Sequence, residues 1–261
     1  MANRSGRSRL TLEGSVTLRF DPAHANVGRR TADSQDRAGA GLAATQAPPP
    51  APPDDSQVVT LLPHRAALWR GDTLLVADLH LGKSETFHAA GVPVPAGLHS
   101  ETLARLGDAI RAAAPRRVLI LGDLLHAPAG TTPALLASVA AWREEFPLPM
   151  QLVVGNHDRR SREATKAWNI EVLGERHLEH RTLFTHEPQN PGDDADYAWC
   201  GHLHPAVTLH GGRLPTKLAC FHLSPRVGVL PAFARMAAGT VYARQPGDRV
   251  FAIAPGRVIE V

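Results

Sequence analysis

The chain has 261 residues, of which 43% are hydrophobic and 20% charged, and its formal net charge at pH 7 is +3. No apolar run approaches the roughly 20 residues that a membrane-spanning helix needs, and no secretory signal follows the N-terminal arginines. Cys200 and Cys220 are the only cysteines, which is too few for a disulfide framework. These features argue against a membrane protein, a disulfide-stabilised secreted domain and a densely basic binding surface. We expect a cytoplasmic protein with one main domain.

The first 56 residues differ in composition from the rest of the chain. They lack hydrophobic periodicity, are rich in Ala, Gly, Arg and Asp, and end in the proline-rich run from Pro48 to Pro53. This composition is typical of a disordered extension. A second interpretation is a translation start assigned too early in a GC-rich gene. In both cases residues 57–261 are expected to form the folded domain.

Short apolar runs separated by turn residues begin at Val58 and predict strands. The strands are expected at residues 58–62, 67–69, 73–77, 117–121 and 151–154, and amphipathic helices at residues 98–114 and 133–146. After Arg181 the helical pattern thins out, and consecutive strands are expected at residues 182–185, 197–200, 206–209, 218–223 and 250–254. The alternation of strands and helices, followed by strands alone, predicts an α/β fold with a second sheet.

Polar motifs follow several of these strands, at the edge where open α/β sheets bind ligands. The motifs are Asp78-Leu79-His80, Gly122-Asp123, Gly155-Asn156-His157-Asp158, Thr185-His186 and Gly201-His202-Leu203-His204. Asp78 and His80, one residue apart, point to the same side and can reach one ion. Asp123 can bridge two ions through its two oxygens. Each motif alone is more often a turn with a surface histidine, but the five in this order predict a two-metal site.

The ligand types bear on which metal is bound. Histidine is the commonest metal ligand, and 13 of the 14 histidines lie after residue 56. Carboxylate, amide and imidazole ligands without a thiolate suit Mn or Fe better than structural zinc. We therefore expect two divalent ions, with Mn as the first choice and Fe or Zn as the alternatives.

This ordered set of motifs resembles the calcineurin-like binuclear metallophosphoesterases, from about Val58 to the C-terminus. The resemblance implies a four-layer sandwich of two mixed β-sheets flanked by α-helices. It also implies that the first ion is held by Asp78, His80, Asp123 and His204, and the second by Asp123, Asn156, His186 and His202. His157 would then stand free at the substrate.

A closer resemblance is to the ligase-associated DNA damage response endonucleases, the PdeM family. It is carried by residues 77–87, 91–97 and 230–233. Metal chemistry does not require residues 91–97, which makes them the more specific marker, although a proline-stiffened loop would also account for them. The resemblance implies a Mn-dependent single-strand DNA endonuclease in DNA repair, with a functional link to a repair helicase and an ATP-dependent DNA ligase.

Two residues after the Gly-Asp motif favour a phosphodiester substrate. Many monoesterases of the superfamily carry Asp and then Arg where this chain has His126 and Ala127. Without the arginine, a doubly charged terminal phosphate loses its bidentate partner. The stretch from Gly122 to His126 also resembles a separate group of DNA nucleases with this fold. His157, assisted by His126, is the expected general acid for the alkoxide leaving group, although His126 could instead be a histidine that only surrounds the metal ligands.

Three basic residues are candidates for substrate contact, and two other functions are compatible with parts of the pattern. Lys83, Arg159 and Arg160 flank the metal motifs and could contact neighbouring phosphates, or they could be ordinary solvated charges. A hydrolase of small nucleotide diesters or pyrophosphates would have nearly the same metal site. A metal-free scaffold on the same fold should have lost ligands, whereas all seven ligand positions are filled here.

Overall fold

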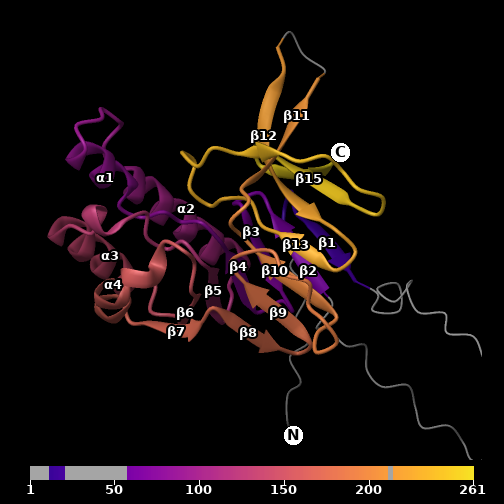
Figure 1. Cartoon of the computed structure of the whole chain (residues 1–261), viewed down its shortest axis with the longest axis horizontal. Coiled ribbons are helices and arrows are strands. Elements are labelled where there is room, and N and C mark those ends of the chain that lie inside the picture. The colour runs from indigo at the N-terminus through magenta and orange to yellow at the C-terminus, as the bar shows by residue number, and fades with distance from the viewer. Residues whose placement is uncertain (1–11, 21–57, 211–213) are drawn as a thin grey trace, which may run out of the picture.

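The computed structural model describes residues 12–20, 58–210 and 214–261, which form two β-sheets with helices on one side (Figure 1). The seven-stranded sheet runs in the order β1-β2-β3-β4-β5-β6-β7. Its strands are β1 (Val16–Arg19), β2 (Val58–Leu62), β3 (Ala66–Trp69), β4 (Thr73–Val76), β5 (Arg117–Leu121), β6 (Met150–Val153) and β7 (Ile170–Gly174). The strands from β1 to β4 pair antiparallel, and those from β4 to β7 pair parallel.

The second sheet has nine strands, in the order β14-β11-β12-β13-β10-β9-β8, with β15 paired to β12 and to β16. Its strands are β8 (Arg176–Glu179), β9 (Thr182–Thr185), β10 (Tyr197–Cys200), β11 (Pro205–Leu209), β12 (Thr216–Leu223), β13 (Val227–Val229), β14 (Thr240–Val241), β15 (Arg249–Ala254) and β16 (Arg257–Glu260). In Figure 1, the β11–β12 hairpin projects away from the body of the protein. The predicted α/β sandwich with two mixed sheets is confirmed.

The helices pack on the first sheet, on the side away from the second sheet (Figure 1). They are α1 (Lys83–Ala89), α2 (Leu98–Ala113), α3 (Pro133–Glu145) and α4 (Arg162–Ala167), with short 3-10 turns at Pro128–Gly130 and Asp158–Arg160. In α2 the residues Leu103, Leu106 and Ile110 recur at helical spacing and are buried against the sheet. Among the described residues, the helical layer is therefore on one side of the sandwich only, which gives three layers where four were predicted.

Large aromatic side chains fill the space between the two sheets. Trp69 of β3 and Phe184 of β9 are fully buried, and their rings meet edge to face at 4.9 Å between centroids. Trp199, Phe221 and Phe251 belong to the same cluster. Burying each such side chain contributes on the order of 2–3 kcal/mol, so the sheets are held face to face and the strand ends that carry the motifs are fixed relative to one another.

The prediction that the domain begins at residue 57 is wrong for residues 12–20. Val16–Arg19 pairs along its whole length with β2, and Leu18 is buried. The ring of Phe20 lies 4.3 Å from that of Tyr197 between centroids, so this segment also contacts the second sheet. The other residues of the expected extension, 1–11 and 21–56, lie outside the described part of the chain. No helix in the described part is long and apolar enough to span a membrane.

Candidate metal centre

The metal motifs of β4 and β5 lie side by side because their loops are joined by backbone hydrogen bonds. Asp78 N–H donates to the carbonyl oxygen of Gly122 over 3.1 Å, and His80 N–H donates to that of Asp123 over 2.9 Å. Both carboxylates are almost completely buried. The parallel pairing of β4 with β5 thus continues into the loops and brings two acidic side chains to one place.

Five of the seven predicted ligands have left-handed backbone conformations, although none is glycine. Their φ angles are 57° at Asp78, 46° at His80, 51° at Asp123, 67° at His202 and 48° at His204. Asp and His tolerate this region better than most residues, but each such residue still costs about 1–3 kcal/mol. Strain of this kind gathers at functional sites, where it is the cost of aiming side chains at one point.

Asp78, His80 and His204 form the first group of donors. The Nε2 atom of His204 lies 3.2 Å from Oδ1 of Asp78 and 3.3 Å from Nε2 of His80. Ligand atoms bound to one ion by bonds of about 2.0–2.2 Å lie roughly 3 Å apart, so this spacing fits a divalent ion. The Nδ1 atom of His80 is buried without a hydrogen-bond partner in the described structure, and burial lowers the pKa of His80 to about 3. His80 is therefore a neutral imidazole, which is the form that binds metals.

The second group of donors surrounds His186, on the loop that follows β9. Its Nε2 atom lies 3.0 Å from Oδ1 of Asn156, 3.1 Å from Nδ1 of His202 and 3.3 Å from Oδ1 of Asp123. Its Nδ1 atom lies 2.9 Å from the carbonyl oxygen of Leu121 and donates a proton to it. This hydrogen bond turns Nε2 toward the other donors, in the manner of metal-binding histidines.

The structure brings all seven predicted ligands into one cluster and shows that Asp78 lies between the two groups. Asp78, Asp123 and His186 can offer donor atoms within 4.8 Å of one another, as can Asp78, His80 and His204. The backbone N–H of His202 also donates to Oδ2 of Asp78 over 3.0 Å. The sequence motifs predict that Asp123 alone is shared by the two ions, whereas in the structure Asp78 belongs to both groups of donors.

Glycines leave the room that this packing needs. A Cβ atom on Gly122, where φ is +77°, would lie 2.3 Å from Nδ1 of His186. On Gly155 it would lie 2.4 Å from Oδ1 of Asp123. Both contacts are far below van der Waals distance, so any larger residue at these positions would displace a donor.

His157 lies beside the cluster, at the end of the loop that follows β6. Its Nδ1 atom lies 2.5 Å from the carbonyl oxygen of His126 and donates to it, and its Nε2 atom lies 3.8 Å from Oδ2 of Asp123. The His126 ring stacks on the His157 ring at 5.6 Å between centroids, and Phe87 stacks on His126. His157 is thus held with Nε2 facing the site, while His126 contributes a carbonyl oxygen and a flat ring.

Asp158 is a buried residue of the site for which no role is predicted from the sequence. Its Oδ1 accepts a hydrogen bond from Leu125 N–H over 3.2 Å, and its Oδ2 accepts one from Gly155 N–H over 3.0 Å. Burial raises the pKa of Asp158 to about 6, although these two hydrogen bonds oppose the shift. The carboxylate ties the loop of Asp123 to the loop of Asn156. The only sequence signal for this was its place at the end of the Gly-Asn-His-Asp motif.

The charge state of His186 predicts that metal binding depends on pH. Burial lowers the pKa of His186, but the hydrogen bond to Asp123 and the charges of Asp123 and Asp78 raise it to about 9. In the ion-free protein at pH 7 His186 is protonated, and an ion must displace that proton because only neutral imidazole binds metal. We expect Mn affinity to rise with pH up to about 9. Titration calorimetry in two buffers of different ionisation enthalpy should show proton release at pH 7 that disappears near pH 10. Equal proton release at both pH values would contradict this.

The three basic residues expected to contact substrate differ in their surroundings. Arg159 lines a cavity of about 210 Å³ together with Asn156 and His186. Lys83 donates to the carbonyl oxygen of Met236 over 2.9 Å and lines a small hollow with His80. Arg160 is exposed and lines neither of these cavities. Arg159 and Lys83 therefore border the two donor groups, and Arg160 does not.

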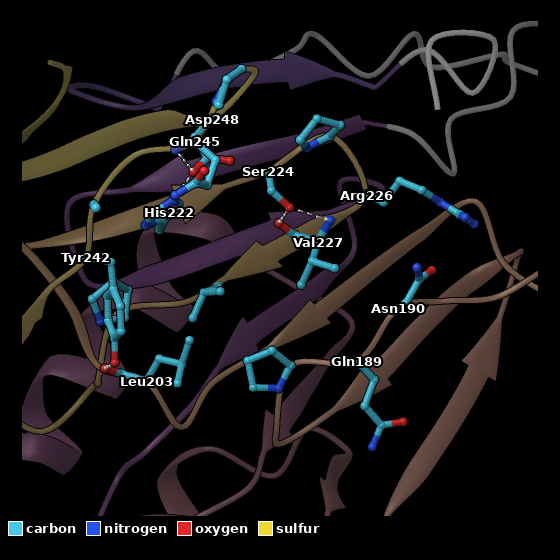
Figure 2. A pocket seen from close by; sticks show the side chains of 16 residues that line it. Gln189, Asn190, Leu203, His222, Ser224, Arg226, Val227, Tyr242, Gln245 and Asp248 are labelled. Atoms are coloured by element: carbon cyan, nitrogen blue, oxygen red, sulfur yellow. Dashed lines mark hydrogen bonds and ion pairs between the residues drawn. The ribbon is translucent and has the colours of Figure 1, made fainter. Parts of the chain in front are cut away.

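A larger cavity, of about 590 Å³, lies on the second sheet (Figure 2). His222 and Asp248 are paired in it over 2.8 Å, and the hydroxyl of Tyr242 donates to the carbonyl oxygen of Leu203 over 2.9 Å. Gln189 lines both this cavity and the one that holds Asn156 and His186. The two cavities are therefore neighbours along one face of the protein.

Comparison with known proteins shows the family to which this chain belongs. No protein-family profile matches the chain, and no curated protein matches its sequence. Among solved structures, the Pseudomonas putida nuclease MPE matches with a TM-score of 0.66 and 32% identity, over 78% of this chain and 95% of that one. The two facing sheets and the carboxylate–imidazole cluster at the strand ends define a fold of the metallophosphoesterase type. Within it, the chain belongs to the family of this Pseudomonas nuclease.

Two further solved structures match at lower similarity. The protein of unknown function AQ665 from Aquifex aeolicus matches with a TM-score of 0.36 and 19% identity, over 54% of this chain and 80% of that one. The E. coli phosphoesterase YfcE matches with a TM-score of 0.37 and 14% identity, over 72% of this chain and 97% of that one. The assignment above does not depend on either of them.

Proposed function

We propose that this protein is a metal-dependent phosphodiesterase that cuts single-stranded DNA, most effectively with Mn, as a member of the PdeM type of repair endonuclease. The observation that carries the proposal is the cluster of seven carboxylate, amide and imidazole donors with His157 fixed at its edge. Bound divalent ions would activate water and offset the charge on a phosphate. The match to a nuclease at 32% identity supports a phosphodiester substrate.

The residues around the cluster favour a diester over a monoester. His126 and Ala127 stand where many monoesterases carry the aspartate and the arginine that serve a terminal phosphate. The ring of His126 is stacked between Phe87 and His157. His157 presents Nε2 on the side of Asp123, where it can give a proton to the oxygen that leaves when a sugar–phosphate bond breaks. An alkoxide needs that proton because it is a poor leaving group.

The proposal is tested by assaying the purified protein with Mn on unstructured single-stranded DNA, on duplex DNA and on bis(p-nitrophenyl) phosphate. We expect cleavage of the single strand and of the aryl diester, and loss of both on treatment with a chelator. Hydrolysis of the aryl diester without any DNA cleavage would point to small nucleotide diesters or pyrophosphates instead. A link to a repair helicase and an ATP-dependent DNA ligase is proposed from the family resemblance alone.

A further inference from the structure

Three arginines from separate segments lie close together near the metal centre. Arg65 is in the turn between β2 and β3, Arg105 is in α2, and Arg235 follows β13. Burial, together with the positive charges of Arg65 and Arg235, lowers the pKa of Arg105 to about 10, although Glu101 opposes the shift. Glu101 is the acid that meets this cluster, 2.9 Å from Nη1 of Arg235. Three positive charges thus face one negative charge, which leaves the cluster with a net positive charge.

Part of the hydrogen-bonding capacity of the cluster is unused within the described structure. The Nε and Nη2 atoms of Arg105 are buried without a hydrogen-bond partner there, and its guanidinium lies 5.1 Å from the centroid of the Phe233 ring. Arg65 is held in place by two hydrogen bonds of 3.1 Å from Nη1 to the carbonyl oxygens of Ala232 and Ala234. A buried donor without a partner costs about 1–3 kcal/mol, and more when it is charged. An anion bound beside Arg65 and Arg235, which line a cavity, would offset the positive charge of the cluster.

The cluster borders the donor group of Asp78, His80 and His204. Arg235 lines a cavity of about 210 Å³ together with Arg65, Lys217 and His204. It also lines the small hollow that contains His80. Since Nε2 of His80 and Nε2 of His204 are 3.3 Å apart, both spaces meet the metal centre at the same donors. An anion held by the cluster would therefore lie next to the reacting phosphate.

We propose that Arg65 and Arg235, with Lys217, bind a backbone phosphate of the substrate strand that neighbours the scissile phosphate, and that Arg105 adds positive charge behind them. This inference rests on the proposed function. A backbone phosphate carries one negative charge on two free oxygens, and guanidinium groups match such oxygens with paired donors. The site would fix the strand on the side of His80 and His204, whereas Arg159 borders the side of His186.

The test uses the exposed residues first, because they are not needed for folding. The variants Arg235→Gln and Lys217→Gln are compared with Arg116→Gln. Arg116 is an exposed arginine directly before β5, at the end of that strand away from Asp123. The substrates are a short single-stranded DNA without terminal phosphates and bis(p-nitrophenyl) phosphate, which has no neighbouring phosphate. The DNA is also used as an inhibitor of aryl diester hydrolysis, which measures its binding whether or not it is cut.

We expect Arg235→Gln and Lys217→Gln each to raise the inhibition constant of the DNA about tenfold, as loss of a charge-assisted hydrogen bond does. The factor by which the rate of aryl diester hydrolysis falls should be about tenfold smaller than the factor by which the rate of DNA cleavage falls. In a plot of the logarithm of DNA affinity against the logarithm of salt concentration, the magnitude of the slope should fall by about one for each charge removed. Arg116→Gln should match the wild type in every assay, and thermal unfolding identifies a variant that has lost its fold.

Three results would overturn the inference. The first is an inhibition constant that is unchanged in all cluster variants. The second is an equal loss of hydrolysis rate on DNA and on the aryl diester, which would mean that the arginines support the metal centre itself. The third concerns strand ends. If the variants bind unphosphorylated DNA as well as the wild type does, and only the wild type gains affinity when the DNA carries a 5′-phosphate, the cluster binds strand ends instead. If the wild type cuts no DNA but the inhibition constant rises in the variants, the nuclease proposal fails and the phosphate site stands.

Discussion

Replacing Asp123 with asparagine is expected to reduce hydrolysis of both single-stranded DNA and bis(p-nitrophenyl) phosphate by about a thousandfold or more. Bound metal ions contribute several kcal/mol to such reactions, and about 1.4 kcal/mol corresponds to a factor of ten in rate. Asp123 lies between Nε2 of His186 at 3.3 Å and the ring of His157. Asparagine keeps the shape and the oxygen that accepts His157 N–H, but it removes the charge that an ion needs.

The measurement is the rate with saturating Mn, together with the metal content of the purified variant by elemental analysis. Asp248→Asn is the matched control, because Asp248 is also a carboxylate bonded to a histidine, His222, over 2.8 Å but lies in the cavity of Figure 2. We expect the control to keep its metal and most of its activity. An Asp123→Asn variant that retains both metal and activity would refute the assignment of Asp123 as a ligand.

The positions of the ligand motifs could be predicted because each is local in the sequence. Asp78 and Asp123 directly follow apolar runs that form the buried strands β4 and β5, and parallel pairing of these strands is enough to place their ends together. The runs at 117–121, 182–185 and 197–200 match the strands to the residue. Sequence reasoning succeeds here because burial on both faces leaves a strong pattern in a few residues.

Other features could not be predicted because they depend on contacts between distant segments. β1 pairs with β2 across the undescribed residues 21–57, and four residues in a polar stretch carry too little pattern to reveal a strand. The left-handed backbone at His202 and His204 results from the packing of the whole site. The arginine cluster is drawn from a turn, a helix and a C-terminal loop, which have nothing in common in sequence.

Removing the imidazole of His157 is expected to slow DNA cleavage much more than hydrolysis of bis(p-nitrophenyl) phosphate, because only the DNA needs a proton on its leaving group. We expect His157→Ala to lower DNA cleavage by about a hundredfold to ten-thousandfold, the usual contribution of general acid catalysis. The aryl diester releases a stable phenolate, so its hydrolysis should fall by less than about tenfold. Initial rates on both substrates, with equal metal content verified, measure the difference.

The comparison with His126→Ala shows how His157 is positioned. That variant keeps the backbone carbonyl that accepts the Nδ1 proton of His157 and loses only the stacked ring, so we expect a loss of about tenfold on DNA. His180→Ala, at a half-exposed histidine between β8 and β9, should change neither rate. If His157→Ala instead lowers both substrates by the same factor with its metal intact, His157 contacts the phosphate rather than the leaving oxygen. The proton would then have to come from another group, and the stacked pair of histidines would serve binding alone.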